Sequence, residues 1–287
     1  MTRATFGQRL AAAVTARGPL CVGIDPHPAL LAGWGLSDDV AGLERFAPVC
    51  VAALAGEVAV LKPQVAFFEA HGSAGLAVLE RTITAAQQAG ALVLADAKRG
   101  DIGSTMSAYA RAWLSEDSPL AVDAVTLSPY LGVGALAPAL TLAAENGRGV
   151  FVLALTSNPE GAAVQRAVGR GGNGAGAGNG AGTTVAQAVV DELAARNVGA
   201  TPMGSAGVVV GATVSSPFLD LSRLNGPVLA PGFGAQGAGV ADLVRVFGRE
   251  RTHVLATSSR DVLRHGPDVA SLRSAAARVR DELLAPR

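Results

Sequence analysis

The chain has 287 residues, of which 49% are hydrophobic and only 16% are charged, and its 23 basic and 23 acidic residues give a formal net charge of +0. A chain of this size can form one large domain, or two small ones, around an ample core. The charge balance argues against a general nucleic-acid-binding protein, which needs a basic face. It leaves room for a local basic pocket that binds a small anion.

Cysteine and histidine usage gives no sign of a metal site or a disulfide framework. Cys21 and Cys50 lie in apolar surroundings, which predicts two core residues of a protein from a reducing compartment. The four histidines are scattered and form no ligand motif. Residues 1–17 alternate charged and apolar positions, unlike a signal peptide, and no apolar run is long enough to span a bilayer. We therefore expect a cytoplasmic protein that binds no metal, membrane or nucleic acid.

Apolar runs typical of buried strands recur along the chain, and segments of helical character separate them. The expected strands are residues 20–24, 58–61, 92–95, 124–127, 149–155, 207–210, 227–230 and 253–256. The expected helices are residues 40–55, 69–90, 105–114, 134–145, 183–196, 217–224, 239–249 and 261–284, where apolar residues recur at spacings of three and four. Eight strand–helix units predict a single-domain α/β protein, a (β/α)8 TIM barrel.

A doubly wound open sheet is the alternative architecture, and two observations favour the barrel. Polar residues follow almost every predicted strand, and in a barrel these strand ends converge on one mouth. No Gly-x-Gly-x-x-Gly motif follows the first strand, as a dinucleotide-binding fold requires.

Residues 169–182 differ from the rest, because they are mainly glycine, alanine and asparagine with Arg170 as the only charge. Such a composition predicts a flexible loop inserted after the fifth strand. A glycine-rich phosphate cradle is the functional alternative, but the segment lacks the Lys-Ser/Thr of a P-loop.

Charged residues gather at the ends of the second and third strands. Lys62 ends the second, Asp96 and Lys98 end the third, and Asp101 lies just beyond. Residues two apart on a strand share a face, and neighbouring strands lie about 4.8 Å apart, so Lys62 should reach Asp96. The alternating charges would keep each group ionised. The array predicts an active site, with a structural salt-bridge network as the alternative.

A second group of residues predicts a phosphate site. The glycine-rich segment 231–237, Pro-Gly-Phe-Gly-Ala-Gln-Gly, follows the seventh strand, and Ser259 and Arg260 follow the eighth. Backbone N–H groups and a guanidinium suit a phosphate, and these two loops are where this fold usually binds one. Ordinary turns are the alternative.

Two further strand ends carry polar groups. Asp25 after the first strand could accept sugar hydroxyls, or it could cap a turn before Pro26. Residues 156–159, Thr-Ser-Asn-Pro, offer hydroxyl and amide groups after the fifth strand, or form a plain turn.

The combination resembles the orotidine 5′-phosphate decarboxylase family. Residues 96–102, Asp-Ala-Lys-Arg-Gly-Asp-Ile, are similar to the family motif Asp-x-Lys-x-x-Asp-Ile. Supporting matches span most of the chain, and residues 62–69 look like the longer bacterial subgroup. These matches are Gly23-Ile24-Asp25, Lys62-Pro63, residues 156–159, residues 231–237 and Ser259-Arg260.

This resemblance implies decarboxylation of orotidine 5′-monophosphate to UMP, the last step of pyrimidine nucleotide synthesis, without cofactor or metal. It implies that Lys98 is the proton donor to C6, that Asp96 lies beside the departing carboxylate, and that Lys62 holds Asp96 and ribose hydroxyls. It also implies a homodimer in which Asp101 and Thr105 enter the neighbouring site.

The remaining substrate contacts are also implied by the resemblance. Asp25 would take ribose hydroxyls and Ser157 would contact the base, while Gly234, Gln236 and Arg260 would hold the phosphate.

Two other functions fit parts of the sequence. One is a Mg²⁺-dependent decarboxylase or aldolase of sugar phosphates on the same barrel, although Lys62 and the lack of an obvious acidic cluster count against it. The other is a non-catalytic phosphate-binding barrel, which would have no use for four costly charges at its mouth.

Overall fold

Eight parallel strands close into a barrel in the order β1-β2-β3-β4-β5-β6-β7-β8. The computed structural model describes residues 3–169, 182–214, 219–234 and 237–285. The strands are β1 (Leu20–Ile24), β2 (Val60–Pro63), β3 (Leu92–Arg99), β4 (Ala124–Leu127), β5 (Gly149–Leu155), β6 (Ala206–Val210), β7 (Val228–Pro231) and β8 (Val254–Ser258). The expected (β/α)8 barrel is confirmed.

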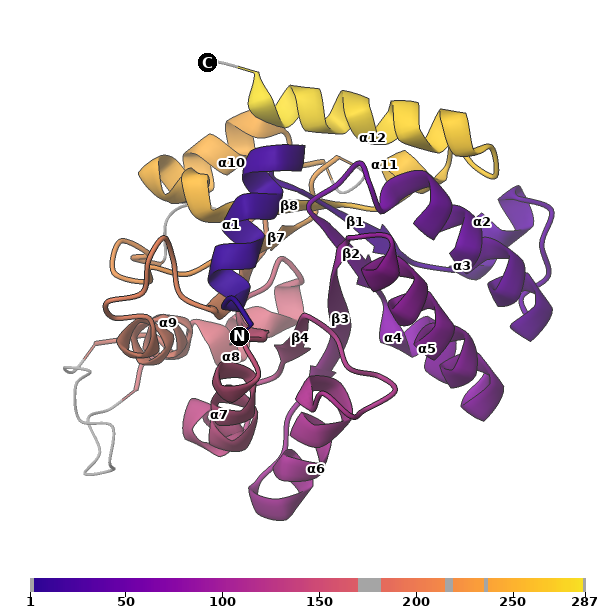
Figure 1. Ribbon diagram of the computed structural model, residues 1–287. Helices are drawn as coiled ribbons and strands as arrows, with labels where there is room; N and C mark the ends of the chain where they lie inside the picture. The colour runs from indigo at the N-terminus through magenta and orange to yellow at the C-terminus, as the bar shows by residue number, and fades with distance from the viewer. Residues whose placement is uncertain (1–2, 170–181, 215–218, 235–236, 286–287) are drawn as a thin grey trace.

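Helices surround the barrel, as Figure 1 shows, and together with loop residues such as Val214, Leu221 and Leu224 they bury its outer face. Both faces of the sheet are therefore covered, which is why the strands read as nearly continuous Val, Leu and Ala. The helices are α1 (Phe6–Arg17), α2 (Pro28–Gly33), α3 (Val40–Leu54), α4 (Val65–Glu69), α5 (Gly72–Gln88), α6 (Gly103–Leu114), α7 (Ala137–Glu145), α8 (Ala162–Gln165), α9 (Val185–Arg196), α10 (Val240–Phe247), α11 (Arg260–Leu263) and α12 (Val269–Leu284). Short 3₁₀ turns occupy Val133–Leu136, Pro159–Gly161 and Gly248–His253.

The N-terminal helix α1 fills the end of the barrel where the strands begin. Phe6 and Leu10 are buried in one cluster with inward-facing strand residues, and the Phe6 ring meets the Phe151 ring edge-on at 6.0 Å. Arg9 and Arg3 both pair with Asp123, which directly precedes β4. Apolar burial and ion pairs together hold α1 across this end, and Figure 1 shows it lying over the barrel.

Two predicted helices differ from what the chain forms. Residues 219–224, the described part of the expected helix 217–224, are irregular, with a turn at 222–223. The Asp220 carboxylate accepts the Ser222 N–H at 2.9 Å, a local bond that competes with helix formation. The expected helix 261–284 is split into α11 and α12, because Pro267 disfavours a helical Gly266 and Asp268 then caps α12 through the Ser271 N–H at 2.8 Å.

The expected flexible insertion falls mostly outside the described residues, which omit 170–181. Its two described ends lie together, because the Gly169 N–H donates to the Thr183 carbonyl at 3.2 Å and Val168 pairs with Thr184 in an antiparallel bridge. The insertion therefore begins and ends at one point beside the barrel.

Candidate active site

The centre of the candidate site is the Asp96 carboxylate, which accepts hydrogen bonds from four side chains. Oδ2 accepts from Lys62 Nζ at 2.8 Å and from Gln64 Nε2 at 3.4 Å. Oδ1 accepts from Lys98 Nζ at 2.5 Å and from the Thr126 hydroxyl at 3.1 Å. The expected contacts of Asp96 with Lys62 and Lys98 are thus confirmed, and β2, β3 and β4 each supply part of the cluster.

Charge, rather than solvent, keeps Asp96 and Lys62 ionised. Burial alone would raise the pKa of the Asp96 carboxyl, but the Lys62 and Lys98 ammonium groups outweigh it and lower that pKa far below its usual range. Burial would likewise lower the pKa of Lys62, but the carboxylates of Asp96 and Asp25 outweigh it and raise that pKa well above its usual range. Both groups are therefore charged near neutral pH.

Lys98 reaches Asp96 from an unusual backbone conformation. Its φ is +48°, in the left-handed region that side-chain-bearing residues rarely adopt. The pairing of β3 with β4 shifts here, because Ala95 pairs with Val125 and Arg99 pairs with Leu127. From one pairing to the next, β3 moves on by four residues while β4 moves on by two. This bulge changes where the Lys98 side chain points.

The next residue, Arg99, is held by side chains of α4 and α6. It pairs with Glu69 at the end of α4, and its guanidinium lies 5.7 Å from the ring centre of Tyr109 and 6.0 Å from that of Trp113, both on α6. These contacts fix the chain immediately after Lys98.

A cavity of about 340 Å³ opens over this cluster at the ends of the strands. The predicted residues Asp25, Lys62, Asp96, Lys98, Ser157 and Arg260 line it. Additional lining residues come mainly from the loops after β5, β7 and β8, and they include Gln64, Thr156, Asn158, Gly232, Phe233, Thr257 and Ser259. Six of the predicted residues thus meet in one concave site at the end of the barrel where this fold carries its active sites.

Asp25 lines this cavity and has an unused hydrogen-bond acceptor. Its Oδ1 is buried and has no hydrogen-bond partner among the described residues, an arrangement that favours a ligand hydroxyl. Gly23 makes room for it, because a Cβ at Gly23 would lie 2.1 Å from Ser259 Oγ and 2.7 Å from both Asp25 oxygens.

The glycine-rich loop after β7 is partly occupied by its own hydrogen bonds. Gly234 has φ +78°, and a Cβ there would lie 1.9 Å from Asp261 Oδ2, so only glycine fits. Its N–H donates to the Ala238 carbonyl at 2.8 Å, so it is not free for a phosphate in this conformation. Gly234 is also absent from the described lining of the cavity, and Gln236 lies outside the described residues.

Asp101 and Thr105 do not join the other predicted residues. Asp101 is half-buried and Thr105 is exposed, and neither is among the described residues that line the cavity. The Asp101 carboxylate accepts the N–H of Ile102, just before α6.

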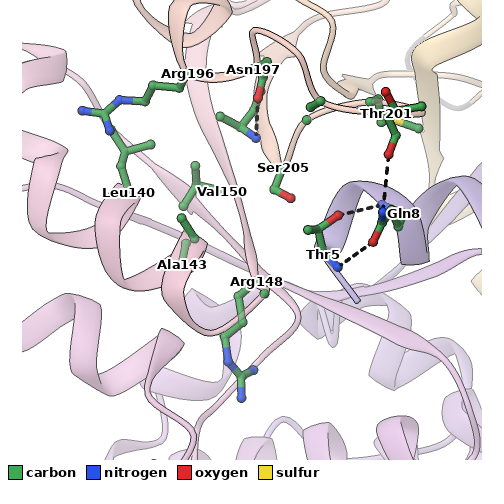
Figure 2. Close-up of a pocket in the computed structure, with 16 residues that line it drawn as sticks. Thr5, Gln8, Leu140, Ala143, Arg148, Val150, Arg196, Asn197, Thr201 and Ser205 are labelled. Atoms are coloured by element: carbon green, nitrogen blue, oxygen red, sulfur yellow. Dashed lines mark hydrogen bonds between the residues drawn. The ribbon is translucent and has the colours of Figure 1, made fainter. Parts of the chain in front are cut away.

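A larger cavity, of about 600 Å³, lies at the opposite end of the barrel. Figure 2 shows Gln8 of α1 hydrogen-bonded to Thr5 and Thr201 at its edge, and Asn197 is bonded to Ala206. The Arg148 side chain points away from the other labelled residues (Figure 2). With its polar lining largely engaged in such bonds, this cavity offers no cluster comparable to that around Asp96.

The described residues contain no group of three or more His, Cys, Asp or Glu placed to hold a metal ion. No helix in the same ranges combines the length and apolar character that crossing a membrane requires. Burial raises the pKa of the Cys21 thiol to about 12, in agreement with a core role.

Sequence reasoning missed Thr126 and Gln64, which both donate to Asp96. A threonine inside the apolar run of β4 is one signal that was available, because it places a polar side chain beside the predicted charges. A separate signal marks the two lysines of the cluster themselves, since Lys62 and Lys98 are the only lysines in the sequence.

Comparison with known proteins agrees with the motif. Residues 18–275 match the family model described as "Orotidine 5'-phosphate decarboxylase / HUMPS family". The chain belongs to the orotidine 5′-phosphate decarboxylase family. The orotidine 5′-phosphate decarboxylase of Salinispora arenicola is 63% identical over 96% of this chain and 95% of its own length. That of Streptomyces coelicolor is 59% identical over 97% of this chain and 96% of its own length.

A solved structure extends the similarity to the fold. The crystal structure of a Streptomyces avermitilis protein, provisionally named orotidine 5′-phosphate decarboxylase, is 58% identical and has a TM-score of 0.91. It covers 99% of this chain, and the match covers 96% of that protein. The Asp96 cluster therefore lies in a chain that matches orotidine 5′-phosphate decarboxylase family members over almost its full length.

Proposed function

We propose that this protein is a carboxy-lyase that converts orotidine 5′-monophosphate to UMP and CO₂ by using its own side chains. The observation that carries the proposal is the Asp96 carboxylate held between two ammonium groups beneath a cavity of substrate size. Family membership supplies the reaction, and the charged cluster supplies a means of performing it.

Loss of CO₂ from C6 leaves an electron pair that the pyrimidine ring delocalises poorly. A fixed positive charge beside C6 stabilises that pair as it forms. Lys98 fits this role, because its side chain is 46% exposed at the cavity while Lys62 is almost fully buried. We assign Lys98 as the donor whose Nζ–H proton passes to C6, leaving a neutral amine and UMP.

Asp96 would contribute through its negative charge. Its lowered pKa keeps it negative, so it would repel a substrate carboxylate bound beside it, and CO₂ loss would relieve that repulsion. Binding energy from the distant phosphate would offset the crowding. Lys62 would hold Asp96 in place from the buried side.

The remaining cavity residues suit a nucleotide. The free oxygen of Asp25 would accept ribose hydroxyls, Ser157 would contact the base, and Arg260 would bind the phosphate. Because the Gly234 N–H is engaged, a phosphate contact there would require the loop after β7 to rearrange.

We also propose a homodimer in which Asp101 and Thr105 serve the neighbouring site. Three large apolar side chains near Asp101 support this arrangement, since Ile102 is 62% exposed, Tyr130 78% and Leu131 52%. They belong to the loops after β3 and β4, and Gly100 lies close against the Ser128 carbonyl where the two loops meet. Apolar exposure of this kind is typical of an interface. The cytoplasmic location stays a prediction.

The direct test follows the absorbance of orotidine 5′-monophosphate with EDTA present. Turnover under these conditions supports the proposed reaction. Activity that disappears with EDTA and returns with Mg²⁺ would point to a metal-dependent reaction instead. Tight UMP binding without any turnover would identify a non-catalytic barrel.

A further inference from the structure

We propose that Thr126 is a positioning residue that holds Lys98 and Asp96 in their reactive arrangement, an inference that rests on the proposed function. Thr126 lies on β4, is 1% exposed, and is not among the described residues that line the cavity. It would therefore act on the substrate only through its two neighbours.

The Thr126 hydroxyl makes two hydrogen bonds whose directions are fixed. Oγ1 accepts the Lys98 backbone N–H at 2.9 Å and donates its proton to Asp96 Oδ1 at 3.1 Å. The reverse direction is not possible, because Asp96 is ionised and the Lys98 amide can only donate. One side chain thus connects the backbone of the proposed acid to the carboxylate that pairs with its ammonium.

The bulge in β3 explains why a side chain is needed at this point. Between Ala95 and Arg99 the chain carries two residues more than β4 opposite it, so the regular ladder is interrupted there. The Lys98 N–H bonds to the Thr126 side chain in place of a backbone carbonyl. Strained conformations persist only when their surroundings determine them, and this bond is one such determinant for Lys98 at φ +48°.

The second bond fixes the orientation of the carboxylate. Thr126 and Lys98 Nζ share Oδ1, while Lys62 and Gln64 share Oδ2. Without the hydroxyl, Oδ1 loses a donor and the Lys98 backbone loses its acceptor. Both changes loosen the ammonium whose placement determines the chemical step.

The experiment compares Thr126→Ser with Thr126→Ala, which differ by one hydroxyl, and adds Thr126→Val, which keeps the branched shape. We expect kcat for orotidine 5′-monophosphate to fall about 10- to 100-fold in the Ala and Val variants, as a displacement of about 1 Å would cause. Thr126→Ser should restore most of the rate. KM should change less than about threefold in all three, because Thr126 does not contact the substrate.

A matched control is Thr82→Val on α5, where another buried threonine, 5% exposed, donates to the Val78 carbonyl of its own helix. It should keep wild-type kcat despite a similar loss of a hydroxyl. Equal kcat for the Ser, Ala and Val variants, or a rise in KM that accounts for the whole loss, would overturn the role of Thr126. Absence of turnover in the wild-type protein would instead refute the proposed function, so the two failures are distinguishable.

Discussion

Lys62 and Asp96 form an ion pair across β2 and β3, with Nζ 2.8 Å from Oδ2 and side-chain exposures of 5% and 10%. Burial makes each charge depend on the other, because neither is solvated well enough to stand alone. Stability and the proposed chemistry therefore share the same two side chains.

Removing the Asp96 charge should destabilise the fold as well as stop turnover. Asp96→Asn leaves Lys62 buried without its closest counter-charge, and breaking such pairs costs about 3–5 kcal/mol. Urea denaturation followed by circular dichroism would measure the loss. The control is Glu44→Gln, which breaks the exposed pair with Arg81 and should cost less than about 1 kcal/mol. Equal losses for both variants would contradict the dependence on burial.

The contribution of Asp96 to the free energy of unfolding should decrease over a defined acidic pH range. Its pKa is lowered in the folded protein from an ordinary value of 3.8, so the stabilisation is fully present above that value and is lost as the pH falls toward the folded pKa. The unfolding free-energy difference between wild type and Asp96→Asn should be constant from about pH 7 to pH 5 and shrink below about pH 4. A difference that stays constant down to pH 3 would contradict the ion pair.

Arg260→Ala should act mainly on substrate binding. A charge-assisted hydrogen bond contributes about 1.5–3 kcal/mol, so KM for orotidine 5′-monophosphate should rise about 10- to 100-fold, with a smaller effect on kcat. Arg264→Ala is the control, because this exposed neighbour pairs loosely with Asp261 and is not among the described residues lining the cavity. Steady-state kinetics would separate them, and an unchanged KM in Arg260→Ala would remove Arg260 from the site.

Sharing of Asp101 between protomers should appear as complementation. Lys98→Ala and Asp101→Asn should each be inactive alone, whereas a refolded mixture should regain activity. In a mixed dimer, the protomer with Lys98 would receive the intact Asp101 of the other. Activity assays and analytical ultracentrifugation of the mixture would test this. A mixture that forms dimers and stays inactive would place Asp101 in its own protomer's site.

Chemical labelling of lysine amines should report on the candidate site, because both lysines of the sequence lie in it. Lys62 and Lys98 are the only lysines, and their side-chain exposures are 5% and 46%. Mild acetylation should therefore modify Lys98 and the N-terminus first, and bound UMP should protect Lys98. Peptide mass spectrometry would locate the label, and rapid labelling of Lys62 in folded protein would contradict its burial.

Much of this architecture could be predicted from the sequence, because strand ends in a barrel face one mouth. Eight apolar runs gave the strands, and strand spacing placed Lys62 within reach of Asp96. Arg260 lines the cavity as expected, but Gly234 does not, and its hydrogen bond to Ala238 depends on backbone geometry that composition does not encode.

The role of Thr126 was missed for a similar reason. A regular strand places Asp96 and Lys98 on one face, and regular geometry offers no use for a hydroxyl on β4. Only the bulge and the positive φ of Lys98 bring that hydroxyl to its backbone N–H. The helix expected over 217–224 failed because local side-chain bonds of Asp220 compete with helical periodicity.

The packing of α1 into the barrel determines by which end substrate and products can enter and leave. With Phe6 and Leu10 filling the end where the strands begin, nucleotide and gas must enter and leave by the same mouth. Carbon dioxide formed in the cavity would share that exit with the nucleotide product, so we expect the departure of one product to depend on the other.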